Sequence, residues 1–394
     1  MKYCVLIVDG AADWPVKEHA GQTCLEAAVT PNLDKLAKKG TMGLVKTVPE
    51  GMEPSSAIAC MSLLGYDPQV YYRGRAAIEA VSAGVPIGED EVIFRCNLVN
   101  IQDGKMNSYC SGHISDEEAA KLIDALNESL GSENVRFFPG VGYRHLLKIK
   151  GHEETVNALC TPAHDISDKN ISDYLPQGNG SEFLRKLMQD SVDVLENHSV
   201  NNDRRTWNEL PANMIWLFWG SGKIPQMPPF SKVYGKSAAI TSAVDLLKGL
   251  GKMMDMQILE IPGVTDNIDN DFIAQVNGGI RALDDHDLVV IHIEAPDEAG
   301  HAGSFEDKVK SIEIIDEQVV SRIMAYKNDD LRVLVMPDHF TPVAIKTHVG
   351  EPVPFLLLGP GFNANGARRF TEAEAKRTGF VIEEGYNIMT TFVE

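Results

Sequence analysis

Five residues able to bind a metal ion follow apolar, β-branched runs of the kind that form buried parallel strands. An aspartate and a histidine four residues apart follow one run, an Asp-His pair follows a second, and another histidine comes nine residues later. These residues are Asp297, His301, Asp338, His339 and His348. An α/β sheet places its ligands at the carboxyl ends of its strands, so we expect the five side chains to converge. They are more than one ion needs from protein, and such nitrogen and oxygen donors suit Mn²⁺ or Zn²⁺ better than Ca²⁺.

A single Asp-x-x-x-His spacing is weak evidence for a metal site. The alternative is that these histidines pair with carboxylates or pack in the core. Three ligand-bearing loops, two of them directly after the predicted strands 288–293 and 331–336, favour the metal site over that alternative.

Asp9 is a further candidate ligand. It ends the apolar run 3–8, which predicts a buried strand, and Gly10 follows it. If this strand is parallel to the other two, Asp9 lies at the same edge of the sheet as Asp297 and Asp338. Asp-Gly is equally common in turns, so the dipeptide alone leaves both interpretations open.

Ser55 and Ser56 lie at the start of a predicted helix that follows Pro54 and ends near Gly65. Free N–H groups and the helix dipole favour an anion at this position. A serine there either caps the helix or acts as a metal-activated nucleophile whose phosphorylated form the dipole stabilises. The local pattern by itself favours the cap.

Several basic residues are candidates for holding an anionic substrate. Arg73 and Arg75 lie on a glycine-containing loop and could bind a phosphate or carboxylate bidentately, whereas Lys236 precedes a predicted strand. The alternative for all three is a solvated surface position. Three further residues carry no signal on their own: His113, Arg144 and His145.

The composition is that of an ordinary soluble globular protein. The chain has 394 residues, 44% of them hydrophobic and 23% charged, and is long enough for two domains. Its net charge of −20 argues against nucleic acid or an anionic membrane as a partner. A small anionic substrate stays compatible with this charge, because metal ions and a few basic residues can make a local positive cleft.

The cysteines and the hydropathy pattern bear on the compartment. Six cysteines are scattered without C-x-x-C spacing, which indicates reduced, intracellular thiols. The sequence shows no signal-peptide architecture and no run of 18 apolar residues that could span a bilayer. We therefore expect a cytoplasmic protein, with its oligomeric state left open.

Strands and helices alternate toward both ends of the chain, as in βαβ units. Residues 30–40, for example, predict a short helix with Thr30 as N-cap and Pro31 at its first position. The pattern changes after about residue 82, where 92–101 alternates as a half-exposed strand does and a capping box opens a helix at Ser115.

These changes predict two domains. We expect an inserted α+β domain over residues 81–181, and a discontinuous α/β domain made of residues 1–80 and 182–394. The predicted helix 182–198 and the predicted strand 213–219 then belong to the discontinuous domain.

Taken in order, these candidates give the chain a family resemblance. It resembles the alkaline phosphatase superfamily and, more closely, the archaeal-type branch of cofactor-independent phosphoglycerate mutase. The likeness extends over nearly the whole chain, and the order and spacing of its motifs are specific. The motifs are VDG at 8–10, TPNLD at 30–34, SLLGYDP at 62–68, GR at 74–75, YRHL at 143–146, APDEAGH at 295–301 and PDH at 337–339.

The resemblance implies a fold and a ligand set. The fold is an alkaline-phosphatase-like, mostly parallel sheet sandwiched by helices, with an inserted smaller α+β domain that covers the substrate. Two divalent ions are implied, Mn²⁺ in the first place and Zn²⁺ or Co²⁺ as alternatives. One ion is held by Asp9, Asp338, His339 and the oxygen of Ser56, and the other by Asp297, His301 and His348.

The implied reaction is the metal-dependent, 2,3-bisphosphoglycerate-independent interconversion of 3-phosphoglycerate and 2-phosphoglycerate, a step of glycolysis. It passes through a phosphoserine at Ser56, and Arg73, Arg75, His113, Arg144, His145 and Lys236 are the candidates for binding the small phosphorylated acid. One departure concerns the substrate, because Ala57 stands where the archaeal-type pattern usually has aspartate. The alternatives are a homoserine kinase-like phosphotransferase or a phosphatase on the same scaffold, and a metal-stabilised binding protein without activity.

Overall fold

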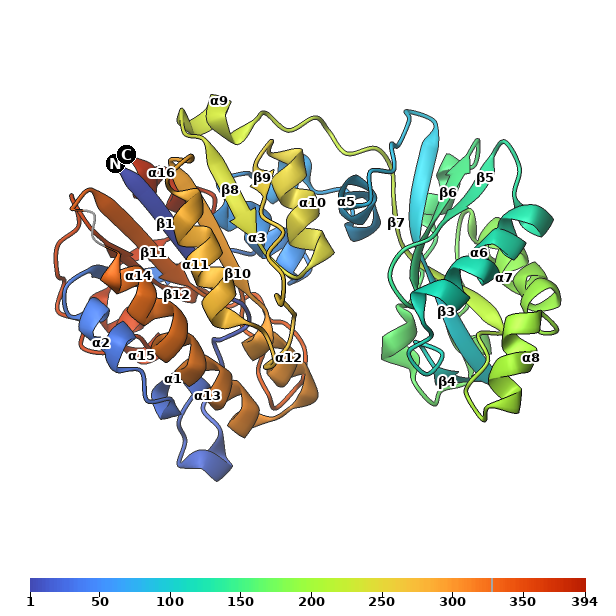
Figure 1. The fold of residues 1–394 in the computed structure, drawn as a ribbon, viewed down its shortest axis with the longest axis horizontal. Helices are drawn as coiled ribbons and strands as arrows, with labels where there is room; N and C mark the ends of the chain where they lie inside the picture. The colour runs from blue at the N-terminus through green and yellow to red at the C-terminus, as the bar shows by residue number, and fades with distance from the viewer. Residues whose placement is uncertain (327–328) are drawn as a thin grey trace. The chain divides into compact units, whose positions relative to one another are not determined.

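The computed structural model describes residues 1–326 and 329–394. The chain forms two compact units, which are coloured by residue number in Figure 1. The larger unit consists of Met1–Tyr72 and Gln226–Glu394, and the smaller unit consists of Arg73–Pro225. Each unit has a sheet and a hydrophobic core of its own.

The larger unit is built on an eight-stranded sheet with the order β13-β2-β12-β11-β1-β10-β8-β9. Four neighbouring strands in its middle, β11, β1, β10 and β8, are mutually parallel, whereas β12 runs antiparallel to both of its neighbours. The strands are β1 (Lys2–Val8), β2 (Thr41–Val45), β8 (Ala238–Thr241), β9 (Gln257–Ile258), β10 (Leu288–Ile293), β11 (Leu331–Met336), β12 (Val353–Leu358) and β13 (Val381–Ile382).

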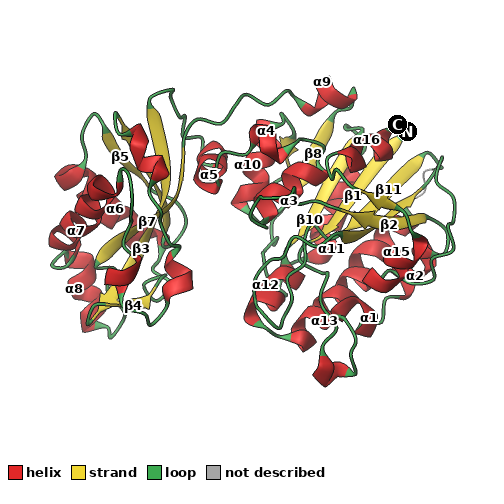
Figure 2. Ribbon diagram, turned by 180° about the vertical axis from the view of Figure 1, so that it is seen from behind, coloured by secondary structure: helices red, strands yellow, loops and turns green. Residues whose placement is uncertain are grey.

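The predicted strands 288–293 and 331–336 are confirmed as β10 and β11, and the apolar run 353–358 forms β12. Their residues are buried almost throughout because helices cover both faces of the sheet, as Figures 1 and 2 show from opposite sides. Successive side chains point to opposite faces. Cys4 and Leu6 of β1 therefore pack in one core, whereas the ring of Tyr3 packs edge-on against Phe392.

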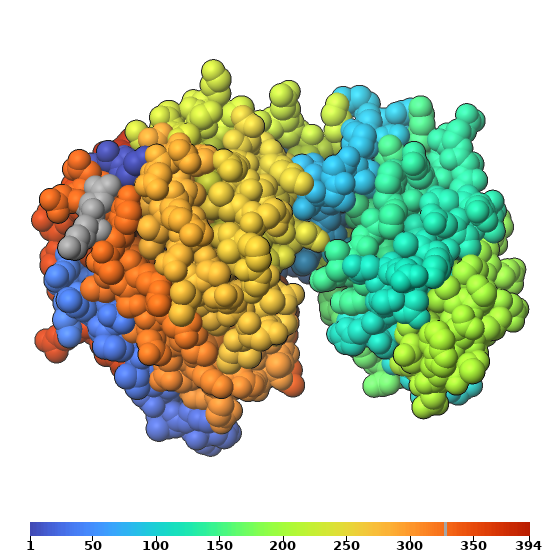
Figure 3. All heavy atoms as spheres, in the orientation of Figure 1, coloured from blue at the N-terminus to red at the C-terminus, as the bar shows by residue number. Residues whose placement is uncertain are grey.

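The helices of the larger unit are mostly short. They are η1 (Lys17–His19), α1 (Cys24–Ala27), α2 (Pro31–Ala37), α3 (Ser56–Leu63), α4 (Pro68–Tyr71), α9 (Phe230–Tyr234), α10 (Asp245–Met253), α11 (Phe272–Ala282), α12 (Ala295–Ala302), α13 (Phe305–Ile314), a π-helix (Ile315–Val320), α14 (Ser321–Ala325), α15 (Glu372–Thr378) and α16 (Asn387–Val393). The segment around η1, dark blue in Figure 3, projects from the surface, and His19 stacks on Phe305 there.

The start of α2 differs from the expectation. Thr30 occupies the N-cap position, but its side chain accepts no capping hydrogen bond. The carboxylate of Asp316, in the π-helix, takes the capping position instead. Its two oxygens accept hydrogen bonds from the backbone N–H groups of Asn32 and Leu33, at the start of α2. A partner from a distant helix thus takes over the capping role.

The segment that carries Asp297 and His301 also differs. We expected a loop, but these residues lie on α12, with Pro296 in its first turn and Gly303 as its left-handed C-cap. Proline at the start and glycine at the end are typical of a helix of this length. The two ligand candidates are therefore one helical turn apart on the same face.

The smaller unit has a five-stranded antiparallel sheet with helices packed on it. β3 (Glu91–Gln102) is its central strand, paired with β6 (Arg144–Lys150) on one side and β7 (Met214–Ser221) on the other. The remaining elements are β4 (Lys105–Ser108), β5 (Val135–Phe138), α5 (Arg75–Ser82), α6 (Asp116–Leu130), α7 (Ser181–Leu195), α8 (Ser199–Thr206) and the 3-10 helices Glu153–Asn157, Ala163–Ile166 and Ile171–Tyr174. The capping box of α6 is confirmed, since Ser115 and Glu118 accept from each other's backbone N–H.

The boundaries of the units correct the expected ones. Residues 182–225 do not return to the larger unit, because β7 pairs with β3 and its side chains Trp216 and Phe218 lie in the core of the smaller unit. For the same reason β3 is buried along most of its length rather than half-exposed. Residues 73–80 belong to the smaller unit as well.

The predicted fold class, a mostly parallel α/β sheet between helices with a smaller α+β part, is confirmed. Among the residues that the structure describes, no helix has the length and apolar character needed to cross a bilayer.

Candidate metal centre and nucleophile

The parallel strands of the larger unit bring the predicted ligands to one edge of the sheet. Asp9 directly follows β1, α12 with Asp297 follows β10, and Asp338 and His339 follow β11. Because these three strands are adjacent and parallel, their carboxyl ends lie side by side. His348 joins them from the loop before β12, where Val349 bridges back to Phe340.

Asp9, Asp338 and His339 form the first group of potential ligands. One donor atom from each lies within 4.8 Å of the others, and all three side chains are fully buried. The Nε2 atom of His339 is 3.2 Å from Asp338 Oδ2 and 3.5 Å from Asp9 Oδ1. Asp338 is held by its other oxygen, which accepts from the backbone N–H groups of Gly10 and His339.

Ser56 lies beside this first group. Its Oγ is 3.1 Å from His339 Nε2, and the side chain is buried. Ser55 is the N-cap of α3 and accepts from the N–H of Ile58, so Ser56 occupies the first helical position. The two serines therefore divide the roles that the sequence left open, with Ser55 capping and Ser56 directed at the ligand group.

Asp297, His301 and His348 form the second group, again with donor atoms within 4.8 Å of one another. The Nε2 atoms of the two histidines are 2.9 Å apart, and Asp297 Oδ2 is 3.2 Å from that of His301. The Nδ1 atom of His301 is 3.0 Å from the carbonyl oxygen of Lys346, so it donates there and Nε2 faces the group. The imidazole is thereby held in the orientation that metal binding needs.

These residues fit divalent metal ions. Each group offers three nitrogen and oxygen donors, a set that leaves coordination positions for substrate or water. Asp9 Oδ1 is completely buried and accepts no hydrogen bond from any residue in the described part of the chain. Since an orphaned buried carboxylate oxygen is costly, a cation is the partner that its surroundings call for.

The electrostatics of the groups agree with this interpretation. Burial and the neighbouring carboxylates Asp338 and Asp297 raise the pKa of Asp9 well above its usual range, which marks an excess of negative charge. Burial lowers the pKa of His339 to about 4, so its imidazole is neutral and able to bind a metal ion at neutral pH. Burial alone would raise the pKa of Asp297, but hydrogen bonds with His301 and His348 hold it well below the ordinary value.

The sequence analysis missed His292 and Glu294. The Nε2 atom of His292 is 2.7 Å from Asp9 Oδ2 and its Nδ1 atom is 3.0 Å from the hydroxyl of Ser242, at the end of β8. With Asp9 ionised, as metal binding requires, Nε2 donates to it and Nδ1 accepts from Ser242. His292 therefore orients Asp9 and leaves its Oδ1 available to a metal ion. A histidine inside an otherwise apolar strand was the signal available for it.

Glu294, Asp9 and His292 also satisfy the geometry of a metal-binding triad. Burial and the charge of Asp9 raise the pKa of Glu294 well above the ordinary value. Nε2 of His292 donates a hydrogen bond to Asp9 and so has no lone pair for a metal ion. We therefore assign His292 and Glu294 to positioning Asp9.

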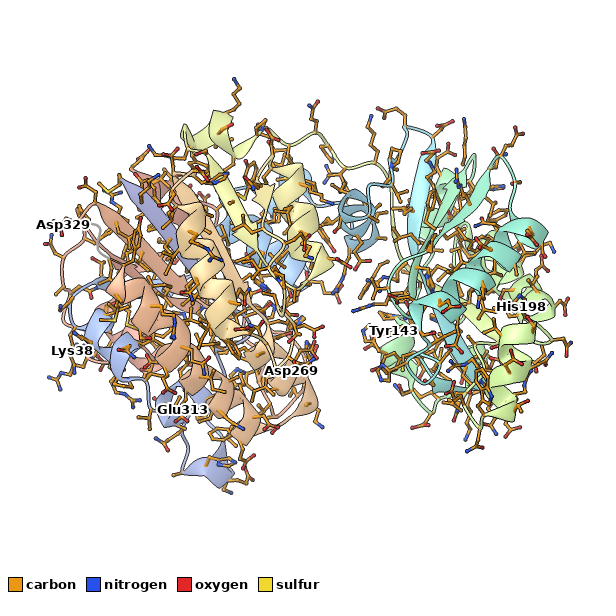
Figure 4. All side chains as sticks on the ribbon, viewed as in Figure 1. Lys38, Tyr143, His198, Asp269, Glu313 and Asp329 are labelled. Atoms are coloured by element: carbon orange, nitrogen blue, oxygen red, sulfur yellow. The ribbon has the colours of Figure 1, made fainter. Side chains whose placement is uncertain are left out.

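Four of the candidates in the smaller unit make local contacts, namely Arg75, His113, Arg144 and His145. Arg75 pairs with Glu79 and its guanidinium lies 4.4 Å from the ring centre of Trp219, whereas the guanidinium of Arg144 lies 5.6 Å from the ring centre of Tyr143. The ring of Tyr143, labelled in Figure 4, also faces His113 edge-on. His145 is buried and accepts from the N–H of Gly140, which fixes the turn before β6.

Lys236 is not brought to the metal-binding groups. It precedes β8, and its Nζ lies 5.6 Å from the ring centre of Tyr3 at the beginning of β1. Tyr3 and Asp9 are separated by six residues of strand, or about 20 Å at ~3.3 Å per residue. Lys236 thus lies at the amino ends of the parallel strands, on the opposite edge from Asp9, because it comes before its strand and not after it.

Fold and site together define a class. Two groups of side chains able to hold a metal ion and a serine at a helix N-terminus, at the carboxyl edge of a parallel sheet, fit the class of metal-dependent phosphoryl-transfer enzymes. The family described as 2,3-bisphosphoglycerate-independent phosphoglycerate mutase matches residues 37–201. A protein of that name from Methanosarcina acetivorans is 46% identical over 380 residues, which are 95% of each chain. The present chain belongs to this family.

Solved structures agree on the fold. The PH0037 protein from Pyrococcus horikoshii has a TM-score of 0.83 and 26% identity, with 99% of this chain and 96% of that chain covered. The cofactor-independent phosphoglycerate mutase from Thermoplasma acidophilum has a TM-score of 0.65 and 24% identity, with 100% and 99% covered. At 24% identity, the likeness to the Thermoplasma acidophilum protein is evidence for the fold alone.

Proposed function

We propose that this protein interconverts 3-phosphoglycerate and 2-phosphoglycerate without 2,3-bisphosphoglycerate, with two divalent metal ions and Ser56 as the nucleophile. The observation that carries the proposal is the position of Ser56, whose Oγ lies 3.1 Å from His339 Nε2 beside the two ligand groups. The family membership supplies the substrate, since the relatives are named as mutases of phosphoglycerate.

Asp9, Asp338, His339 and the Ser56 oxygen would hold one ion, and Asp297, His301 and His348 would hold the other. When bound, such ions lower the pKa of a hydroxyl and stabilise charge on the transferring phosphoryl group. Mn²⁺ is our first choice because the donor set mixes imidazole and carboxylate, with Zn²⁺ and Co²⁺ as alternatives.

The reaction consists of two transfers at Ser56. Ser56 Oγ loses its proton and attacks the phosphorus of 3-phosphoglycerate, the bond from phosphorus to the C3 oxygen breaks, and the C3 oxygen takes up a proton. Glycerate then turns within the site, and its C2 oxygen attacks the phosphoserine. The C2 oxygen loses its proton, the bond from Ser56 Oγ to phosphorus breaks and Ser56 Oγ takes up a proton, so the net change is an isomerisation.

The start of α3 supports the phosphoserine step. Ser56 is the first residue of the helix, where backbone N–H groups lack intrahelical partners and the dipole favours negative charge. A phosphoryl group on Oγ therefore gains a favourable position that a serine in mid-helix would not offer. Ser56 is buried, and a position with little access to water would protect the intermediate from hydrolysis.

We also propose a set of residues that bind the carboxylate and phosphate of the substrate. The proposal is supported by their cationic or hydrogen-bonding side chains, and the residues are Arg73, Arg75, His113, Arg144 and His145. Arg73 is the first of these to test, because substitution by glutamine removes its charge while retaining a polar side chain. We expect an increased KM for 3-phosphoglycerate.

The decisive experiment is a coupled assay for 2-phosphoglycerate after chelation and readdition of Mn²⁺. We expect activity that returns with the metal, needs no bisphosphoglycerate and is lost in Ser56→Ala. Ser55→Ala is the matched control, since it removes a neighbouring hydroxyl that only caps α3 and costs about 1 kcal/mol of stability. Full turnover of Ser56→Ala would contradict the proposal.

A second arm of this assay concerns the homoserine kinase-like alternative that Ala57 raised. Ala57 is completely buried in α3, and the named relatives do not favour that alternative. Incubation with homoserine and ATP should give no phosphohomoserine. Transfer to homoserine, together with no turnover of 3-phosphoglycerate, would replace the proposed function.

A further inference from the structure

Thr341 connects the two groups of metal-binding residues. Its hydroxyl donates to Asp297 Oδ1 of the second group, and the same oxygen lies 3.1 Å from His339 Nδ1 of the first group. The side chain is completely buried. This hydroxyl therefore joins a member of one group to a member of the other.

The direction of these two hydrogen bonds follows from the chemistry of the groups. An ionised carboxylate only accepts, so the single hydroxyl proton of Thr341 goes to Asp297. The hydroxyl oxygen then accepts from His339, which must carry its proton on Nδ1. His339 is thereby fixed in the tautomer whose Nε2 lone pair faces Asp9, Asp338 and Ser56.

The rest of Thr341 is held as firmly as its hydroxyl. Its N–H donates to the carbonyl oxygen of Ala12, and its own carbonyl oxygen accepts from the buried ammonium of Lys308 at 2.8 Å. The backbone of Thr341 is thus attached to the loop after β1 and to α13, and its side chain has one position available.

Two glycines keep room for this arrangement. A Cβ atom on Gly10 would come within 2.4 Å of Asp297 Oδ1 and 2.7 Å of Thr341 Oγ1, and Gly10 has a φ of +60°. A Cβ atom on Gly300 would come within 2.7 Å of the carbonyl oxygen of Thr341. Any larger residue at either position would push Thr341 away from its partners.

We propose that Thr341 is a positioning residue that couples the two metal sites through its hydroxyl, by orienting Asp297 of one site and fixing the tautomer of His339 in the other. The inference rests on the proposed function, because it presupposes that both groups bind metal. Thr341 itself contacts neither substrate nor the reacting oxygen in this assignment. Its loss should therefore act on metal binding at both sites.

The test is a titration of the metal-free protein with Mn²⁺ alone. Calorimetry measures the affinity, and electron paramagnetic resonance detects the bound ion. Thr341→Val keeps the volume but removes the hydroxyl, and we expect the affinity of both sites to fall by roughly 10- to 100-fold, as for other residues that orient ligands. Thr341→Ser keeps the hydroxyl and should restore the affinity of both sites toward the wild-type value.

Thr47→Val is the matched control for a general loss of stability. Thr47 is also buried, and its hydroxyl donates to the carbonyl oxygen of Asp338 at 2.6 Å, but it reaches only one ligand loop. If Thr341→Val weakens metal binding no more than Thr47→Val, or weakens only one site, the coupling role is refuted. Failure of the wild-type protein to bind two ions would instead contradict the proposed function.

The tautomer gives a second measurement that a purely structural role would not change. In the metal-free wild-type protein, the ¹⁵N shifts of His339 should show a protonated Nδ1 and an unprotonated Nε2. In Thr341→Val this preference should be lost, and in Thr341→Ser it should return. An unchanged tautomer in Thr341→Val would overturn the proposal even if metal affinity fell.

Discussion

The ammonium of Lys308 lies 2.8 Å from Asp13 Oδ2, and both side chains are completely buried. The same Nζ also donates to the carbonyl oxygens of Ala12 and Thr341, so its three protons have three acceptors. The ion pair therefore joins α13 to the loop after β1 and to the loop after β11. These are the loops that carry Asp9, Asp338 and His339.

Replacing Lys308 by methionine should destabilise the protein severely. The change leaves the carboxylate of Asp13 buried without its cation, and breaking one half of a buried pair typically costs about 3–5 kcal/mol. The free energy of unfolding from urea titration measures the effect. Lys310→Met is the control on the same helix, where the exposed side chain should matter by less than about 0.5 kcal/mol. Equal losses for the two variants would show that the buried pair contributes nothing special.

Metal binding should release a proton from His301. Burial alone would lower the pKa of His301, but the hydrogen bond and charge of Asp297 raise it to about 9. At pH 7 the metal-free imidazole is therefore largely protonated and must lose its proton to bind an ion. Below pH 9, affinity at this site should fall by about tenfold per pH unit.

Calorimetry in two buffers with different ionisation enthalpies measures the proton count, which should approach one per ion at this site at pH 7. The stability of the metal-free protein changes with pH in the opposite direction to the affinity for metal. A raised histidine pKa contributes stability to the metal-free protein below its ordinary value of 6.5, and that contribution is lost as the pH rises through about 9. A heat of binding that is the same in both buffers would argue against a protonated His301.

Glu372 should make the stability of the protein depend on pH. Burial raises its pKa from 4.5 to about 7, although it accepts hydrogen bonds from the N–H of Asp13 and the hydroxyl of Thr23. The folded protein then binds the proton more tightly than the unfolded chain does. This contribution is fully present below pH 4.5 and is lost as the pH rises to about 7.

The variant Glu372→Gln should remove this part of the dependence, which appears as a smaller difference between urea midpoints at pH 5 and pH 8. Glu374→Gln on the same helix is the control, because the hydrogen bond from Arg377 lowers the pKa of Glu374. Glu374→Gln removes an interaction that stabilises the protein above the ordinary pKa of glutamate. It should therefore not reduce the loss of stability between pH 5 and pH 8. If Glu372→Gln leaves the loss of stability between pH 5 and pH 8 unchanged, another group causes that loss.

The boundary of the smaller unit can be tested with fragments. A fragment of residues 73–225 should fold cooperatively, since it contains the whole five-stranded sheet and its core. A fragment of residues 81–181 should not, because it lacks β7 and so exposes one edge of the central strand β3 and the core that Trp216 and Phe218 complete. Circular dichroism and urea unfolding of the two fragments measure this. Cooperative unfolding of the shorter fragment would restore the boundary that the sequence pattern suggested.

The sequence predicted the strands that carry the site because they are continuous apolar runs, which periodicity identifies without any knowledge of partners. It also predicted that Asp297 and Asp338 would meet, and that Asp9 would join them if its strand were parallel, since residues after parallel strands share one edge of a sheet. The same reasoning, applied to Lys236, would have placed it at the opposite edge, because it precedes β8. In contrast, the run 213–219 was assigned to the discontinuous domain but pairs with β3 of the smaller unit, because an apolar run does not specify which sheet it joins.

What the sequence by itself determined is therefore the set of side chains able to bind metal, the strands that deliver them and the general order of the elements. Only the tertiary structure decided that β7 pairs with β3, that Asp316 caps α2, that His292 orients Asp9 and that Thr341 lies between Asp297 and His339. The physical reason is that apolar periodicity and capping motifs are local, whereas a hydrogen bond between residues tens or hundreds of positions apart depends on how the strands and helices pack. The single proton of the Thr341 hydroxyl has its direction only in that packed arrangement.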